Sequence, residues 1–298
     1  MDKKTKVLVT GAGSPIGHSI IQSLVATGVE VTGTYRIKNQ LIDELANLPI
    51  HLIQLDICHE ADYKNLPGFI DVVVHVASEL NIRDGSIEQM LRTNVFGVGN
   101  IQKYSLNALA KKIIFISSLS IHGTIQGEEV NHITPVLHPD LYGATKFLGE
   151  RIFCASSDKV PTVAIRLPGV LSGKYHSAWI PKISRLLMTD NDVHAYSLKS
   201  FFNNAIYAQD LSVFIVKLAI ELEWQGFHAF PIGASDKIRI IDVVQQLKKG
   251  LNSRSRIYEI EGNRPSFTVN SDYAISNFSY MPHNIRDVLN KYIDELRQ

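Results

Sequence analysis

The chain has few of the features that mark secreted, membrane, nucleic-acid-binding or metal-binding proteins. It contains only two cysteines, Cys58 and Cys154, which are too few for a disulfide framework and fit a reducing compartment. No apolar run approaches the length of a membrane span, and the run Val7–Val9 suits a strand rather than a signal-peptide core. A formal net charge of +1 gives no electrostatic reason to bind nucleic acid, and the 11 histidines offer no pair with metal-ligand spacing. We therefore expect a cytoplasmic protein without a metal that acts on a small molecule.

What remains is an ordinary globular composition with a repeated strand–helix pattern. With 45% apolar and 20% charged residues, the 298 residues fit one large domain with a modest second lobe. Short β-rich runs alternate with helical patterns, which predicts a doubly wound parallel sheet of the α/β class. The expected strands are residues 6–10, 30–35, 51–55, 72–76, 112–117 and 162–166, and the expected helices include 95–110, which Asn94 opens, and 142–154.

The C-terminal part is less regular. Helical patterns cover residues 179–188, 209–223, 241–251 and 285–296, and short strands are expected at 193–196, 205–207, 227–231 and 257–260. Long excursions beyond the carboxyl ends of a sheet are where a substrate-binding region is built. We expect residues 1–168 to form the domain of the sheet, and residues 169–298 a smaller substrate-binding lobe interleaved with it.

A glycine-rich loop follows the first expected strand and precedes a helical pattern. It comprises Gly11, Gly13, Ser14, Pro15, Ile16 and Gly17. Glycines let the backbone approach a pyrophosphate, whose charge faces the free amides of the helix N-terminus. The alternative is a loop with turn chemistry only. The context of strand, loop and helix favours a dinucleotide cofactor.

Arg36 directly follows the second expected strand, where dinucleotide-binding folds place the adenosine ribose. A carboxylate there suits the 2′-hydroxyl of NAD, whereas a guanidinium suits the 2′-phosphate of NADP. The alternative is a solvated arginine at a strand end. We expect NADP, with NAD the less favoured cofactor.

Tyr142 and Lys146 are spaced to lie one turn apart on the same face of a helix. A free phenol has a pKa near ~10, and a nearby cation brings that pKa towards neutral pH. Tyr142 could then exchange a proton with a substrate oxygen. For an isolated pair of this spacing, a packed tyrosine and a solvated lysine are the commoner explanation.

Several motifs support the catalytic interpretation because they occur together and in order. They are Thr10-Gly11-x-Gly13-x-x-x-Gly17, Asp56-Ile57, His75-Val76-Ala77, Asn94, Ser117-Ser118 and Tyr142-x-x-x-Lys146. Along residues 6–170 the chain resembles the extended short-chain dehydrogenase/reductases, which include the NAD(P)-dependent epimerase/dehydratase group acting on nucleotide sugars. The resemblance implies a Rossmann-like fold in which the first domain binds NAD(P).

The resemblance also assigns roles to individual residues. Tyr142 would be the acid/base, Lys146 would bind the nicotinamide ribose, and Ser118 would hydrogen-bond the substrate carbonyl. Asn94 would support the site; its alternative role is a helix N-cap, and that of Ser118 is a cap at the end of a strand. The remaining cofactor contacts that the resemblance implies are Asp56, Ile57, Val76, Ala77, Ser78 and Pro168.

The chain departs from the family pattern mainly where substrate would bind. Ser14 replaces the middle glycine of the loop, and His122 replaces a tyrosine and becomes a candidate substrate contact. Leu119-Ser120 replaces the acidic pair of sugar 4,6-dehydratases, which argues against that reaction. Gly169 and Asn203 stand where nucleotide-sugar enzymes carry Asn and Arg. Arg264, before Pro265, is the one match to a family phosphate ligand and the predicted substrate-binding cation.

We therefore expect an NADP-dependent oxidoreductase that reduces a ketone on a small polar substrate, with a nucleotide-linked keto-sugar as the leading substrate. The alternatives are a nucleotide-sugar epimerase with retained NAD(P) and a non-catalytic NADP-binding regulator, since fold does not fix function.

Members of the family often dimerise through the helix after Asn94 and the helix bearing Tyr142. A homodimer is expected on that basis, with apolar residues on these helices at Val95, Val98, Ile101, Phe147, Leu148 and Ile152. The alternative is that all of these residues face the sheet.

Overall fold

The computed structural model describes residues 4–80, 87–174, 178–262 and 266–298. The chain forms two compact units, and it passes from one to the other several times. The first unit comprises Met1–Gly123, Val136–Arg166 and Leu211–Phe230, and the second comprises Thr124–Pro135, Leu167–Asp210 and Pro231–Gln298. Residues 211–230 therefore belong with the N-terminal unit although they lie late in the chain.

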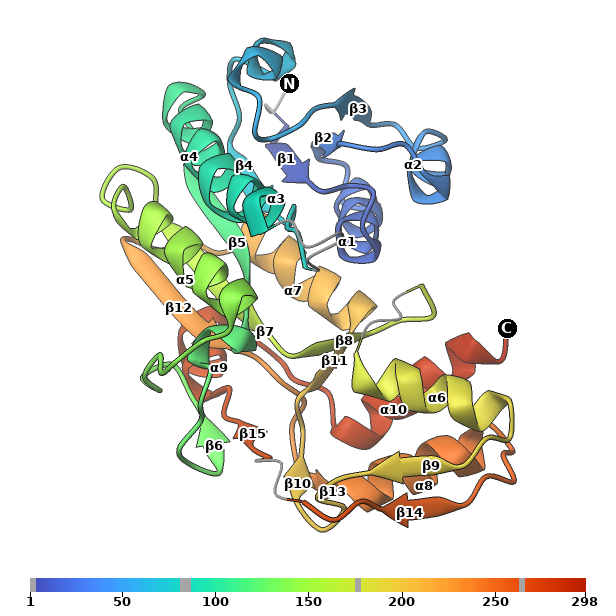
Figure 1. Cartoon of the computed structure of the whole chain (residues 1–298). Coiled ribbons are helices and arrows are strands. Elements are labelled where there is room, and N and C mark those ends of the chain that lie inside the picture. Colours follow the sequence, from blue (N-terminus) through green and yellow to red (C-terminus); the bar gives the residue numbers. More distant parts are fainter. Residues whose placement is uncertain (1–3, 81–86, 175–177, 263–265) are drawn as a thin grey trace. The chain divides into compact units, whose positions relative to one another are not determined.

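A seven-stranded sheet forms the centre of the first unit, in the order β12-β7-β5-β4-β1-β2-β3 (Figure 1). β1 pairs in parallel with β2 and β4, β2 pairs in parallel with β3, and β4 with β5. The order reverses beside β1, as in a doubly wound sheet, so the predicted fold class is confirmed. The strands are β1 (Lys6–Thr10), β2 (Glu30–Tyr35), β3 (His51–Gln54), β4 (Val72–His75), β5 (Lys112–Ser118), β7 (Thr162–Leu167) and β12 (Phe227–Pro231).

The central strands are apolar because both faces of the sheet are covered. Val73 of β4 and Phe115 of β5 are fully buried and share one core cluster with Phe153 from a covering helix. The helices of this unit are α1 (Pro15–Val25), α2 (Gln40–Leu45), α3 (Ile87–Leu91), α4 (Gly97–Asn107), α5 (Leu141–Cys154) and α7 (Ala208–Ile220). Short 3-10 helices cover Glu60–Asn65 and Leu119–His122.

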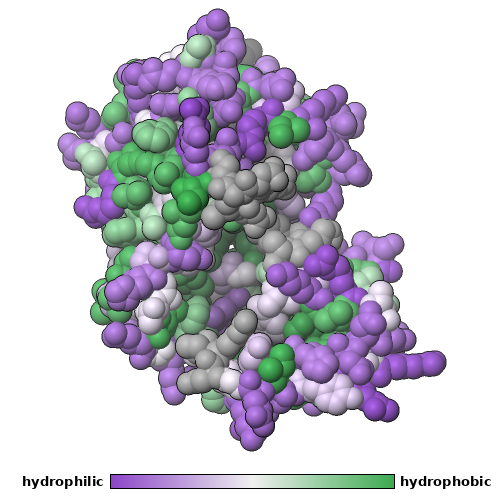
Figure 2. Space-filling model, in the orientation of Figure 1, coloured by the Kyte–Doolittle hydropathy of each residue, from purple (hydrophilic) through white to green (hydrophobic). Residues whose placement is uncertain are grey.

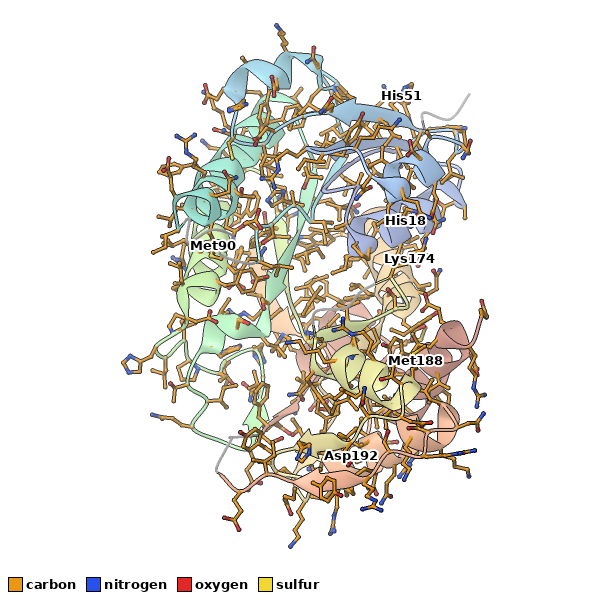
Figure 3. The ribbon with its side chains drawn as sticks, turned by 45° about the vertical axis from the view of Figure 1, so that its right-hand side comes forward. His18, His51, Met90, Lys174, Met188 and Asp192 are labelled. Carbon is orange, nitrogen blue, oxygen red and sulfur yellow. The ribbon has the colours of Figure 1, made fainter. Side chains whose placement is uncertain are left out.

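Two adjacent helices of this unit are joined by a histidine. His18 of α1 is almost fully buried, and its Nε2 lies 3.0 Å from Oε2 of Glu44 on α2 (Figure 3). This contact fixes α2 beside the helix that follows the glycine-rich loop.

Asn94 does not open a helix, which corrects the sequence prediction. It lies in a π-helical turn, Arg92–Phe96, between α3 and α4, and α4 ends at Asn107 rather than at residue 110. A π-helical turn widens the helix locally, and such turns often occur at functional sites. Asn94 is 2% exposed, so the turn carries its side chain inward instead of leaving it at a helix cap.

Two-stranded sheets and helices make up the second unit, as far as its residues are described. The strand pairs are β8 (Gly169–Leu171) with β11 (Ala205–Tyr207), β9 (Val193–Ala195) with β14 (Ile257–Glu259), β10 (Phe201–Phe202) with β13 (Ile238–Arg239), and β6 (Glu129–Val130) with β15 (Thr268–Val269). The helices are α6 (Trp179–Met188), α8 (Ile240–Gly250), α9 (Asp272–Phe278) and α10 (Ile285–Leu296). Val193, Val244 and Tyr292 lie in one buried cluster, which is the core of this unit. Among the described residues, no helix is long and apolar enough to cross a membrane.

Candidate active site

The glycine-rich loop lies against the end of β4. Gly11 has a φ of +75°, and a Cβ at this position would stand 2.8 Å from the backbone nitrogen of Ala77. Only glycine adopts this conformation readily and leaves the space free. The loop after β1 and the backbone of Val76 and Ala77 after β4 are therefore closely packed.

Ser14 closes the loop at the point where the family pattern has a glycine. Its hydroxyl donates to the carbonyl oxygen of Gly11 at 2.8 Å and accepts from the N–H of Gly17 at 3.1 Å. Pro15 follows as the first residue of α1. A serine at this position caps the helix and fixes the turn at its N-terminus, where backbone amides attract phosphate. The altered motif thus forms a capped turn at the N-terminus of α1.

Thr10 and His75 fix the ends of β1 and β4 to each other. Thr10 Oγ1 lies 2.7 Å from His75 Nδ1 and accepts from the N–H groups of Val76 and Ala77, each at 3.2 Å. This contact and the two backbone donors hold the ends of the two strands together. Burial, and then the Lys146 cation, lower the pKa of His75 to about 3, so this ring is neutral.

Asn94 ties the segment after β4 to α5. Its Oδ1 accepts from Ser78 Oγ at 3.1 Å and from the N–H of Glu79 at 2.8 Å. Its Nδ2 donates to the carbonyl oxygen of Glu79 at 2.9 Å and to Thr145 Oγ1 at 3.0 Å. Both the oxygen and the nitrogen of the Asn94 amide are thus hydrogen-bonded. They hold the backbone around Glu79 next to the helix that bears the predicted catalytic pair.

The start of α5 is packed against the loop that follows β5. Asp140 caps the helix by accepting from the N–H of Gly143 at 2.7 Å. A Cβ on Gly143 would lie 2.1 Å from the carbonyl oxygen of Ser120, so only glycine allows this approach. Ser118 ends β5, and its hydroxyl accepts from the N–H of Ser120 at 3.1 Å, which leaves its hydrogen for another acceptor. The structure thereby brings the segments of Ser118 and Tyr142 together in the first unit.

Lys146 is buried one turn after Tyr142 on α5. Its Nζ lies 4.2 Å from the ring centroid of Phe115, a distance at which the cation is attracted to the ring face. Burial lowers the pKa of Lys146 to about 7, while the nearby Glu150 acts in the opposite direction. The ammonium group of Lys146 therefore loses its proton readily near neutral pH, and a nearby charge such as that of Glu150 affects its protonation.

Glu150 anchors this helix in the core, and the sequence analysis gave it no role. Its carboxylate accepts from Arg166 Nε at 3.2 Å and Nη2 at 2.9 Å, and from Ser117 Oγ at 2.6 Å. All three side chains are buried. The sequence feature that could have indicated a role for Glu150 is its position four residues after Lys146, which places both side chains on the same helix face.

The remaining predicted cofactor residues lie at the ends of β2 and β3. Arg36 follows β2, and its Nη2 lies 3.3 Å from Oε2 of Glu79. Asp56 follows β3 and accepts from the N–H of Cys58 at 2.9 Å. Ile57 is buried, and its carbonyl oxygen accepts from Tyr63 Oη at 2.9 Å and Asn100 Nδ2 at 3.0 Å. Glu79 is the residue here that sequence reasoning missed, because its partner is 43 positions away.

The predicted substrate contact His122 follows Ser118 in the segment after β5. His122 is fully buried in the 3-10 turn after β5, and Arg264 lies outside the described residues. Pro168, a predicted cofactor contact, lies between β7 and β8 and belongs to the second unit. Asn203 uses its amide within that unit: Nδ2 donates to Ala234 O at 3.0 Å and Val269 O at 2.8 Å, and Oδ1 accepts from Val269 N at 2.7 Å.

The doubly wound sheet, the capped glycine loop and the Tyr–Lys helix define an extended short-chain dehydrogenase/reductase. Within that class, residues 8–229 match the model of the 3-beta hydroxysteroid dehydrogenase/isomerase family, and the chain belongs to this family.

Two curated relatives share part of the sequence. A 2-alkyl-3-oxoalkanoate reductase of Shewanella oneidensis is 27% identical over 190 residues, which cover 62% of this chain and 48% of the relative. Sterol demethylase protein B of Methylococcus capsulatus is 23% identical over 171 residues, which cover 56% of this chain and 52% of the relative. The chain thus spans about half the length of the curated relatives it matches.

Solved structures resemble the chain over almost its whole length. A UDP-glucuronic acid 4-epimerase from Bacillus cereus in complex with NAD has a TM-score of 0.83 at 19% identity, with 99% of both chains covered. A dTDP-glucose 4,6-dehydratase from Bacillus anthracis in complex with NAD has a TM-score of 0.81 at 16% identity, covering 98% of this chain and 96% of that one. At these identities the likeness establishes the fold.

Proposed function

We propose that this chain is an NAD(P)-dependent oxidoreductase that reduces a ketone. A buried lysine one turn beyond Tyr142, in a family named for dehydrogenases, is the observation that carries this proposal. Tyr142 supplies the proton to the carbonyl oxygen, and Lys146 stabilises the phenolate that remains. Ser118 donates its free hydrogen to the same oxygen, and Asn94 positions the backbone beside α5.

The residues present fit a bound dinucleotide. The cofactor supplies hydride transfer, and the protein positions it and controls the proton. The capped loop after β1 offers backbone amides for the pyrophosphate, and the packing of Gly11 on Ala77 leaves no side chain between the two strand ends. Arg36, with 42% of its side chain exposed, is the group available for the 2′-phosphate of NADP. We therefore propose NADP as the preferred cofactor, although NAD is the dinucleotide named with the structural neighbours.

The oxidoreductase proposal is tested by the absorbance spectrum and by turnover of the purified protein. A reductase should be isolated without nicotinamide and should oxidise added NADPH in the presence of a suitable ketone. A nucleotide-sugar epimerase would instead retain tightly bound NAD(P). A protein that binds NADPH but consumes none with any ketone of the panel would be a regulator, and the catalytic proposal would be abandoned.

Two substrate classes are to be compared. A nucleotide-linked keto-sugar is suggested by the names of the structural neighbours and by Arg264. A 3-oxoacyl compound is favoured by the name of the 27% identical relative and by Asn203, whose amide is already occupied. Calorimetry of the NADP complex with UDP, dTDP and a 3-oxo fatty acid distinguishes them. Nucleotide binding weaker than millimolar, about 4 kcal/mol, would exclude the keto-sugar.

We also propose that the protein forms a homodimer through α4 and α5. Phe96, next to α4, is 66% exposed and Leu148 of α5 is 46% exposed. Figure 2 shows hydrophobic surface on the side of the first unit where Figure 1 draws α4 and α5. Val98 and Ile101, named with the predicted interface, are instead buried in the core of this unit.

A further inference from the structure

An ion pair crosses the carboxyl end of β1. Arg36 follows β2, and Glu79 lies four residues beyond the end of β4, while β1 runs between these two strands in the sheet. Arg36 Nη2 and Glu79 Oε2 are 3.3 Å apart, with side-chain exposures of 42% and 18%. The pair therefore spans the edge at which the proposed cofactor would enter, and the carboxylate is the more deeply buried partner.

The two partners differ in how firmly they are held. Both backbone groups of Glu79 are bonded to the side chain of Asn94, at 2.8 and 2.9 Å, and Asn94 is bonded in turn to Thr145 of α5. Arg36 is fixed through its backbone, since its carbonyl oxygen accepts from Gln54 Nε2 at 3.1 Å. The guanidinium, with 42% of its side chain exposed, has more room to turn away from the pair than the Glu79 side chain, which is 18% exposed and follows a backbone held by Asn94.

We propose that Glu79 determines cofactor specificity by competing with the 2′-phosphate of NADP for Arg36. This inference rests on the proposed function, because it assumes that the dinucleotide binds at this edge. To bind the 2′-phosphate of NADP, Arg36 must give up its contact with Glu79, because both anions compete for the same guanidinium donors. NAD brings a hydroxyl, which can donate to a carboxylate without displacing the arginine. Glu79 thus limits the preference for NADP that Arg36 creates, and allows the protein to accept both cofactors.

The test is the Glu79→Gln variant of the full chain, which keeps the shape of the side chain and removes its charge. Dissociation constants for NADPH and NADH are measured by fluorescence titration, and those for adenosine 2′,5′-bisphosphate and adenosine 5′-phosphate by calorimetry. We expect NADPH and the bisphosphate to bind about tenfold more tightly than to the wild type, equivalent to about 1.4 kcal/mol. NADH and adenosine 5′-phosphate should change by less than about twofold or bind more weakly.

Two further variants make the result specific. Glu88 of α3 forms a surface ion pair with Arg92 at 2.9 Å. Glu88→Gln removes this carboxylate and should leave the ratio of the NADPH and NADH dissociation constants unchanged. Arg36→Ala combined with Glu79→Gln should lose the gain for NADPH, because the freed arginine is what binds the phosphate.

The outcomes separate the two proposals. If Glu79→Gln changes the dissociation constants for NADPH and NADH by the same factor, so that their ratio is unchanged, the role of Glu79 is overturned while the oxidoreductase proposal stays intact. A gain for NADPH that persists without Arg36 would also overturn it. If the wild type binds neither dinucleotide, the proposed function fails, and this inference fails with it.

Discussion

At the scale of single residues, the candidate site depends on Lys146, whose charged form is destabilised by burial. Lys146 is enclosed by α5 and the aromatic ring of Phe115, and burial lowers its pKa from 10.5 to about 7. The neighbouring His75 stays neutral because burial, and then the charge of Lys146, lower its pKa to about 3. No second cation therefore forms beside the lysine at neutral pH, and Glu150 remains the charge that favours its protonation.

The first prediction is that Lys146→Met stabilises the cofactor-free protein at neutral pH and abolishes function. Removing a buried ammonium relieves a penalty on the order of a few kcal/mol, which should raise Tm by several degrees. NADPH affinity and turnover should both fall, since the lysine would serve the ribose and the phenol. Calorimetric melting and fluorescence titration provide the two readouts. A variant that melts below the wild type at pH 7 would contradict a costly buried charge.

The second prediction is the pH dependence of that stabilisation. Between pH 7 and 10.5 the unfolded state binds more protons at this lysine than the folded state, so wild-type stability rises with pH across this window. The Tm advantage of Lys146→Met over the wild type should therefore shrink by more than about half between pH 7 and pH 9.5. An advantage that stays constant over this range would show that the lysine is not the titrating group.

The third prediction concerns the proton donor. Tyr142→Phe removes only the phenolic hydroxyl and should lower kcat by at least ~10²-fold. NADPH affinity should remain nearly intact, because the substitution keeps the aromatic ring and leaves the cap of α5 by Asp140 unchanged. Steady-state kinetics under conditions where chemistry limits the rate, together with a cofactor titration, test this. Near-normal turnover would remove Tyr142 from the mechanism.

At the scale of elements, the site depends on how closely α5 approaches the loop after β5. The fourth prediction compares two glycines in helices. Gly143→Ala forces a Cβ against the Ser120 carbonyl oxygen, 2.1 Å away, and should destabilise the protein by about 3 kcal/mol, the cost of severe overpacking. Gly99→Ala in α4 meets no atom within 4 Å and should stabilise by about 0.5–1 kcal/mol through better helix propensity.

Urea unfolding of the two variants provides the comparison, with the midpoint as the readout. The same direction of change in both variants would mean that the approach of α5 to Ser120 does not limit the structure. Gly143→Ala should also reduce activity beyond its effect on stability, because moving α5 moves Tyr142 away from the segment of Ser118.

At the scale of the whole molecule, the fifth prediction is assembly. Light scattering at micromolar concentration should give the mass of two chains. Leu148→Lys places a charge on the exposed face of α5 and should convert the dimer to monomer without lowering Tm by more than a few degrees, since Leu148 lies outside the core. A wild-type mass of one chain would refute the dimer.

Local sequence patterns were sufficient to predict most helices and strands, but not to predict which strands pair with one another. The predicted helices at 179–188 and 285–296 match α6 and α10 at both ends, because amphipathic spacing and end signals are local. The seven-residue α9 and the two-residue strands β6, β10, β13 and β15 were not predicted, since segments so short carry no periodicity. Phe227–Pro231 was predicted as a strand, but its place at the edge of the main sheet depends on a distant partner.

The sequence by itself determined the fold class, the glycine loop and the spacing of Tyr142 and Lys146, because each depends on residues close together in the chain. Only the tertiary structure decided that Thr10 holds His75, that Asn94 clamps Glu79, and that Arg36 already has an anionic partner. It also placed His122 in the interior, where its side chain is fully buried. Thr10 and His75 are 65 positions apart in the chain, Arg36 and Glu79 are 43 apart, and Asn94 and Glu79 are 15 apart. Contacts at these separations leave no periodic trace in the sequence.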